Sequence, residues 1–163
     1  MGLDMSLTAD HFMWTYKPEQ KELAKQIAEL IGIDATVQSV KFEAGYWRKA
    51  NQIHKWFVDN VQGGVDNCSD HYVDVAKLTE LKKLCTSLLD CYEATGTEDQ
   101  PISEEFSDLC QKHLPPFEGF FFGTYEIDQY YVQDLKDTVA ILEGCEKLSD
   151  DHPGLDFKYH SSW

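Results

Sequence analysis

The spacing of apolar and polar positions predicts a series of helices. Between Pro18 and Gly32, apolar residues recur every three or four positions, the proline suits a first helical turn, and the glycine suits a helix end. The most regular stripe follows Asp74, whose carboxylate is placed to cap a helix. Its members are Leu78, Leu81, Cys85, Leu88, Leu89 and Tyr92. A stripe of this kind is usually the side of a helix that faces the core.

Three further helices are predicted. The first covers residues 46–61 and is ended by Gly63-Gly64. A shorter one carries residues 102–110 and stops before Pro115-Pro116. The last is capped by Thr124 and has an apolar face that runs from Ile127 to Leu142. Residues 36–42 alternate imperfectly, which fits either a short strand or an extended connector.

These elements predict a mainly α fold. We expect one compact helical domain over residues 15–148, with four to five helices and at most one short strand or extended segments. Residues 1–14 are interpreted as an N-terminal tail or extended lead-in, and residues 149–163 as a C-terminal tail, because neither segment has a convincing period.

The charge of the chain is strongly acidic. It has 29 Asp and Glu against 14 Lys and Arg, a formal net charge of −15 and a pI near 4.6. Such a surface repels free nucleic acid, so direct binding to DNA or RNA is not expected. Two interpretations stay open: the charge serves solubility, or it lets the protein imitate nucleic acid or dock on a basic partner.

The remaining composition favours a soluble intracellular protein. The five cysteines are odd in number and several fall at apolar helix positions, which predicts reduced thiols and no disulfides. No apolar run is long enough to span a bilayer, so we expect a cytoplasmic location and no membrane contact. Cys68-x-x-His71 resembles half of a zinc site without a second half, so no metal and no other cofactor is expected.

The densest cluster of functional side chains lies between Tyr46 and Phe57. On a helix, one face carries Tyr46, Ala50, Ile53, Phe57 and Val61 and is expected to be buried. Trp47, Asn51 and His54 fall on one flank, and Arg48 and Lys55 lie on the far side. This flank could hold a planar ligand or a partner, and its cations could approach phosphate. Alternatively, these residues are simply boundary side chains between core and solvent.

A second aromatic cluster is bracketed by Gly119 and Gly123. Phe120, Phe121 and Phe122 fit the wall of a ligand groove or a partner interface, with Tyr130 close behind. The alternative is that two of the rings fill the core and one is half exposed. Together with Trp47, the second cluster could form a stacking site, which requires the two segments to meet.

The two segments together resemble a known family. The helix Tyr46-Trp47-Arg48-Lys49-Ala50-Asn51, with Ile53-His54 and Trp56-Phe57, and the downstream Gly119-Phe120-Phe121-Phe122-Gly123 are similar to small uncharacterised proteins of tailed phages and prophages. The resemblance covers residues 40–142. Pro115-Pro116-Phe117-Glu118 stands where that family often carries Pro-Thr-Gln-Ser. The family has no established activity, so the resemblance implies a context, a bacterial host cell, and no mechanism.

In this context three classes of function are considered. The first is an accessory protein, without enzymatic activity, that binds and modulates a host or anti-phage defence component. The second is a binder of a small ligand or nucleotide-like signal that uses Trp47, Arg48, Asn51, His54 and residues 120–122. The third is an enzyme with His54 as acid or base, which lacks a recognisable partner residue. The sequence predicts no oligomeric state.

Overall fold

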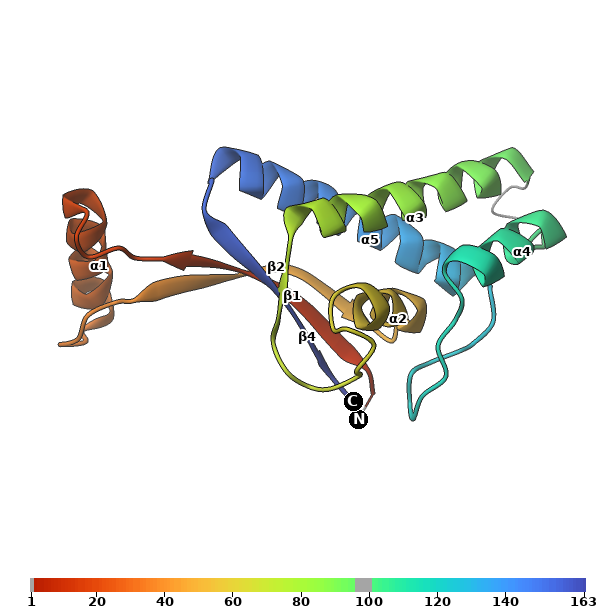
Figure 1. The fold of residues 1–163 in the computed structure, drawn as a ribbon, viewed down its shortest axis with the longest axis horizontal. Coiled ribbons are helices and arrows are strands. Elements are labelled where there is room, and N and C mark those ends of the chain that lie inside the picture. The colour runs from red at the N-terminus through yellow and green to blue at the C-terminus, as the bar shows by residue number, and fades with distance from the viewer. Residues whose placement is uncertain (1, 96–100) are drawn as a thin grey trace.

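The computed structural model describes residues 2–95 and 101–163. Over these residues it contains five helices and a four-stranded antiparallel sheet, so the expectation of a mainly α protein is wrong and the fold is α and β (Figure 1). The strand order is β2-β1-β4-β3. The elements are β1 (Asp4–Phe12), α1 (Pro18–Ile31), β2 (Ser39–Arg48), α2 (Asn51–Asn60), β3 (His71–Val73), α3 (Val75–Thr95), α4 (Glu104–His113), α5 (Gln129–Asp151) and β4 (Leu155–Ser162).

The two segments expected to be tails are the inner strands of the sheet. β1 pairs with both β2 and β4, so residues from the two ends of the chain lie side by side. Alternate residues of β1 are buried, namely Met5, Leu7 and Ala9, and β4 repeats this pattern with Phe157 and Tyr159. A period of two is the mark of a strand with one buried face. The alternation is present in both segments of the sequence, so the expectation of two tails without a convincing period is wrong.

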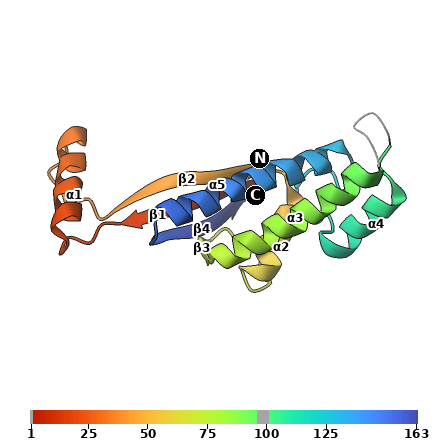
Figure 2. The ribbon, with the colours of Figure 1, turned by 90° about the horizontal axis from the view of Figure 1, so that it is seen from above.

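The helices that follow β2 form a second layer against the buried face of the sheet. α5 packs on β2, and α3 packs on α5 (Figures 1 and 2). The contact between α5 and β2 is close at Gly45, where a Cβ would overlap the side chain of Ile141. Only glycine lets the two backbones approach in this way. An antiparallel sheet with helices on one face is a common two-layer arrangement.

Most of the helix predictions after residue 74 are confirmed. In α3 the apolar stripe is buried apart from Leu89, which is half buried against the core, and the Asp74 carboxylate accepts a hydrogen bond from the Ala76 amide. α5 begins later than expected, because the side chain that caps it is Asp128 and not Thr124. The five cysteines are free thiols, as predicted. Within the described parts of the chain, none of the helices has the length and apolar content to cross a membrane.

The predicted helix over residues 46–61 is wrong at its start. β2 continues to Arg48, and α2 begins only at Asn51. The change of direction occurs at Lys49, which has a positive φ of 62° although it is not a glycine. No glycine or proline marks this break in the sequence, so helical spacing alone carried the prediction too far. Tyr46 is therefore an exposed strand residue, whereas Ala50, just before α2, and Ile53 and Phe57 within it are buried as expected.

α1 has the predicted bounds but not the expected environment. Gly32 ends the helix in a left-handed conformation, as its position indicated. The helix lies at the far end of the β1–β2 ribbon, away from the other helices (Figures 1 and 2). Of its apolar stripe, Leu23, Leu30 and Ile31 are exposed. The stripe that was expected to face the core therefore faces solvent.

Candidate functional site

The side chain of Asn51 joins the two clusters identified in the sequence. Its Nδ2 donates hydrogen bonds to the carbonyl oxygens of Phe122 at 3.2 Å and Thr124 at 2.8 Å. Its Oδ1 accepts a hydrogen bond from the Phe117 amide at 2.9 Å. One buried amide thus satisfies three backbone groups of residues 117–124, a segment without regular structure that we call the aromatic loop. The two segments meet here.

Glycines shape the aromatic loop as closely as the hydrogen bonds do. A Cβ on Gly119 would overlap the ring of Phe122. Gly123 has a φ of 101°, and a Cβ there would lie 3.1 Å from the Cβ and 3.2 Å from the carbonyl oxygen of Lys49. The loop therefore lies directly on the junction between β2 and α2. Left-handed conformations at Lys49 and at Phe121, whose φ is 64°, add backbone strain at this point.

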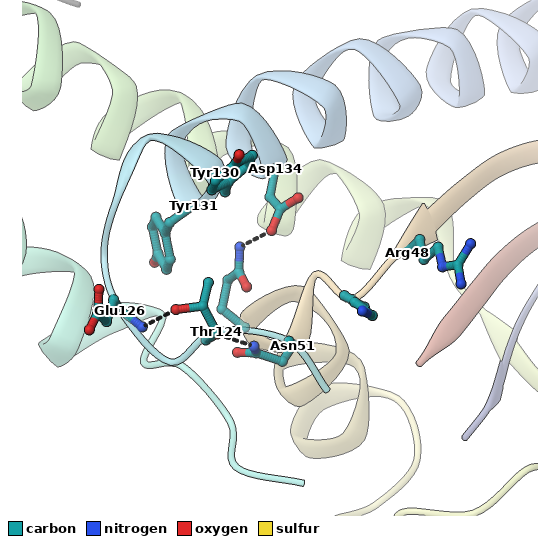
Figure 3. Close-up of a pocket in the computed structure, with 10 residues that line it drawn as sticks. Arg48, Asn51, Thr124, Glu126, Tyr130, Tyr131 and Asp134 are labelled. Atoms are coloured by element: carbon teal, nitrogen blue, oxygen red, sulfur yellow. Dashed lines mark hydrogen bonds between the residues drawn. The ribbon is translucent and has the colours of Figure 1, made fainter. Parts of the chain in front are cut away.

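Next to this junction lies a pocket of about 230 Å³ (Figure 3). It is bounded by the end of β2, the start of α2, the end of the aromatic loop and the first turns of α5. Its side chains supply both charges, amides and hydroxyls. The polar members are Arg48, Lys49, Asn51, Gln52, Thr124, Glu126, Tyr130, Tyr131 and Asp134.

Asp134 is the electrostatically unusual group in the pocket. Burial raises the pKa of its carboxyl to about 6, and the hydrogen bond from Gln52 opposes this shift. Gln52 is itself buried, and its Nε2 donates to Asp134 Oδ2 at 2.9 Å. The negative charges of Asp137 and Asp128 raise the same pKa further. A carboxyl that changes its charge near pH 6 at the edge of a pocket is a feature of binding and catalytic sites.

His54 lies in the core and does not line this pocket. Its Nδ1 is 2.8 Å from the Tyr159 hydroxyl. Nε2 is 3.2 Å from Asp66 Oδ1, without the geometry of a directed hydrogen bond. Burial lowers the pKa of the imidazole, and this effect outweighs the attraction of the Asp66 carboxylate. The ring is therefore neutral near pH 7, and it packs edge-on against Phe122 with the centroids 5.4 Å apart.

The other candidates from the first cluster are distributed over three environments. Trp47 is buried, and its indole N–H donates to Thr138 Oγ1 at 2.9 Å. Arg48 lines the pocket but is directed away from Asp134 and Thr124 (Figure 3), and its Nε lies 3.9 Å from Asp4. Lys55 pairs with Asp59 at 2.6 Å on the surface of α2. The structure therefore does not bring these three side chains to one site.

The second cluster divides into one buried and two exposed rings. Phe122 is buried, whereas Phe120 and Phe121 are 82% and 53% exposed. The two exposed rings contact each other edge to face, with their centroids 4.2 Å apart. Tyr130 is 77% exposed and lines the pocket. This differs from the alternative of two core rings and one half-exposed ring, because most of the aromatic surface is open to solvent.

Sequence reasoning missed six of the polar pocket residues, namely Lys49, Gln52, Thr124, Glu126, Tyr131 and Asp134. Lys49 and Gln52 lie within the first cluster, but the predicted continuous helix from Tyr46 assigned their side chains to the wrong directions. Asp134 carries no local signal, since a single acid on an amphipathic helix is normally solvated. Among residues 2–95 and 101–163, no group of three or more His, Cys, Asp and Glu side chains could hold a metal ion.

Fold and site thus define a two-layer α and β domain with a pocket next to an exposed aromatic loop. Comparisons of the chain with models of protein families, with curated proteins and with solved structures found no match.

Proposed function

We propose that this protein is a binding protein, without enzymatic activity, whose recognition surface is the aromatic loop together with Tyr130 at the rim of the pocket. The observation that carries the proposal is the pair of exposed rings at Phe120 and Phe121, which project from a loop that Asn51 holds by three hydrogen bonds. Exposed aromatic side chains on a preorganised support are typical anchors of protein interfaces.

Preorganisation is the main physical argument. An exposed phenylalanine loses little entropy on binding if the backbone beneath it is already fixed. Here the backbone is fixed from below by Asn51 and by the buried ring of Phe122, which packs against His54 and Phe117. The loop thus exposes apolar rings although the left-handed backbone conformation of Phe121 is strained. Apolar side chains that are exposed next to one another on a soluble protein are a frequent mark of an interaction site.

The nature of the partner follows from charge and from context. The net charge of −15 favours approach to a basic or neutral protein surface and disfavours nucleic acid. The resemblance of residues 40–142 to phage and prophage proteins supports a host or anti-phage defence component in the bacterial cytoplasm. We propose that the protein modulates such a component by binding it.

The direct test is affinity capture from host lysate, followed by mass spectrometry. Wild-type protein is compared with the double variant Phe120→Ala and Phe121→Ala, and the expected result is loss of the specific partner with the variant. Tyr72→Ala is the matched control, because Tyr72 is 70% exposed on the short strand β3. Equal capture by all three proteins would contradict a role for the aromatic loop.

A second function, binding of a small polar ligand, is favoured by the pocket itself. Lys49 and Asp134 offer opposite charges, and Asn51, Gln52 and Thr124 offer amides and a hydroxyl around a space of about 230 Å³. This volume is below the roughly 300–1,000 Å³ of pockets that enclose a drug-sized ligand, so it suits a small zwitterionic molecule or one polar end of a nucleotide-like ligand better than a large apolar one. Lys49→Ala and Asp134→Asn are expected to abolish a thermal shift produced by a member of a nucleotide and metabolite panel, while Lys55→Ala, outside the pocket, leaves it unchanged.

The burial of His54 weighs against the third function, acid–base catalysis. The imidazole is fully buried, and both of its nitrogens face protein groups, Tyr159 and Asp66. A general acid or base has to reach its substrate directly or through one water molecule. We therefore interpret His54 as a structural residue that ties α2 to β4.

A further inference from the structure

The pocket between the start of α2, the aromatic loop and the first turns of α5 has a balanced set of charges. Of its ten lining residues, Arg48 and Lys49 are cationic, and Glu126 and Asp134 are anionic. The lining therefore carries no net charge, in a chain whose total is −15. A pocket that selects a simple anion or a simple cation is expected to carry an excess of the opposite sign. This balance favours a ligand with charges of both signs.

Asp134 has no cationic partner, although two cations line the same pocket. In the described parts of the chain it forms no ion pair, and one of its carboxylate oxygens, Oδ2, accepts a hydrogen bond at 2.9 Å from the buried Gln52 (Figure 3). Burial raises the pKa of this carboxyl to about 6, Asp137 and Asp128 raise it further, and no cation among the described residues lowers it. A half-buried carboxylate is normally stabilised by a positive charge. Asp134 is therefore available to the cationic group of a ligand.

Lys49 is the corresponding unpaired cation, at the junction of β2 and α2. Its ammonium group forms no ion pair or hydrogen bond with the residues that the structure describes. The stem of the side chain lies between two glycines, since a Cβ on Gly2 would be 3.3 Å from Lys49 Cε and a Cβ on Gly123 would be 3.1 Å from Lys49 Cβ. α2 begins at Asn51, and its first turn has neither an acidic residue nor a capping side chain. The positive end of the helix dipole and the Lys49 ammonium group therefore act on the same wall, which suits a carboxylate.

The size of the pocket limits the ligand further. A closed cavity of about 150 Å³ holds one benzene molecule, so a pocket of about 230 Å³ accommodates roughly six to ten non-hydrogen atoms. A small α-amino acid has this size and carries one carboxylate and one ammonium group. Lys49 and Asp134 line the same space but form no ion pair with each other in the described structure. An amino acid can neutralise both charges at once, whereas a single ion leaves one of them unpaired.

We propose that the pocket binds a small amino acid, with the ligand's carboxylate at Lys49 and the N-terminus of α2 and its ammonium group at Asp134 and the Tyr130 hydroxyl. The proposal rests on the second function given above, binding of a small polar ligand, and assigns the chemical class of that ligand. Hydrogen bonds between charged groups are stronger than those between neutral ones, so each end of the ligand is expected to contribute at least roughly tenfold to the affinity.

The first experiment is a nuclear magnetic resonance titration of the full chain labelled with nitrogen-15. The probes are the twenty common amino acids, β-alanine and γ-aminobutyrate, each up to about 10 mM. The expected result is a saturable shift of the backbone amide signals of residues 48–52 and 123–126 with at least one probe. The signals of α4 should not move, because none of its residues lines the pocket.

The second experiment pairs ligands and variants that each lack one charge. The deaminated and decarboxylated analogues of the tightest probe are expected to bind the wild type at least roughly tenfold more weakly than the probe itself. Lys49→Gln and Asp134→Asn preserve side-chain size, and each is expected to weaken the amino acid by a similar factor. Lys49→Gln should not weaken the decarboxylated analogue further, and Asp134→Asn should not weaken the deaminated one. Lys55→Gln and Asp150→Asn, outside the pocket, are the matched controls and should retain wild-type affinity.

Three results would overturn the proposal. The first is a nucleotide that binds in the pocket while no amino acid does, which would preserve the second function and remove the assigned class. The second is that neither kind of probe shifts the pocket signals, which would remove both. The third is an amino acid whose affinity is the same as that of an analogue without one charge, or is unchanged in both pocket variants. This third result would leave Asp134 as a structural link between α5 and α2.

Discussion

Two polar side chains on the same short helix, Asn51 and His54, are equally buried but serve different neighbours. Asn51 is 2% exposed and His54 is fully buried. The polar contacts of His54 are with Tyr159 and Asp66, in a network closed to solvent on the Tyr159 side, although its ring also packs against Phe117 and Phe122 of the aromatic loop. Asn51 faces the backbone of a loop that carries two exposed rings and one wall of a pocket.

Burial and hydrogen bonding alone therefore do not separate a structural residue from a functional one. The two kinds of residue differ in the segment that they bind. His54 contacts Tyr159 of β4, an inner strand whose alternate residues belong to the core. Asn51 binds the strained aromatic loop with its exposed apolar rings, a combination that costs stability and is typical of binding sites.

The largest expected effect on stability is that of His54→Ala. It removes a buried ring that contacts Phe117, Phe122 and Tyr159, and it leaves the Tyr159 hydroxyl without this partner. A cavity and an unsatisfied polar group together are expected to lower the free energy of unfolding by about 2–4 kcal/mol. Urea denaturation measures the change. A loss below about 1 kcal/mol would contradict the structural role of His54.

Asn51→Ala is expected to have a smaller effect on stability, about 2 kcal/mol, because three backbone groups of the aromatic loop lose their partner. Its specific consequence is faster hydrogen exchange within residues 117–124, with little change in α3 and α5. Asn51→Asp is the informative companion, since it keeps the acceptor for the Phe117 amide but loses both donors. Unchanged exchange in the loop would show that other contacts hold it.

Asp134→Asn is expected to stabilise the protein at alkaline pH. The folded carboxyl has a pKa of about 6, above the ordinary value of 3.8, so ionisation costs the folded state stability as pH rises from about 4 to 6. The variant lacks this loss, so its free energy of unfolding is expected to exceed that of the wild type by about 1–2 kcal/mol above pH 6. This is less than the energy equivalent of the whole pKa shift, because solvent at the pocket screens the charge. Below pH 4 the gain should vanish. Thermal melts at pH 3.5 and pH 8 compare the two conditions, and an equal gain at both would rule out ionisation as its cause.

The smallest effect on stability is expected for Phe120→Ala with Phe121→Ala. Both rings are exposed, so the free energy of unfolding should change by less than about 0.5 kcal/mol, apart from strain that remains at residue 121. The same variant is expected to lose partner binding. A large loss of stability would instead show that these rings belong to the core.

The sequence predicted the helices that build the core better than it predicted the sheet. α3 and α4 follow from continuous apolar stripes with a cap at Asp74 and a stop before Pro115. Of β2, only a possible short strand over residues 36–42 was predicted, because residues 39–43 lie in the projecting ribbon, where no buried face imposes alternation, and residues 46–48 were assigned to a helix. Of the site, the sequence located both segments. It missed their geometry because the turn at Lys49 depends on tertiary contacts, here a hydrogen bond from its amide to the Leu3 carbonyl.

The central claim is tested most directly by partner capture with Asn51→Ala and with Leu142→Ala, which removes a buried side chain of α5 outside the aromatic loop, at a temperature where circular dichroism shows both variants to be folded. Asn51→Ala is expected to lose the partner, whereas Leu142→Ala, although at least as destabilised, is expected to retain it at the wild-type level. If capture instead follows stability, with Leu142→Ala impaired and Asn51→Ala unaffected, the aromatic loop held by Asn51 is not the recognition surface.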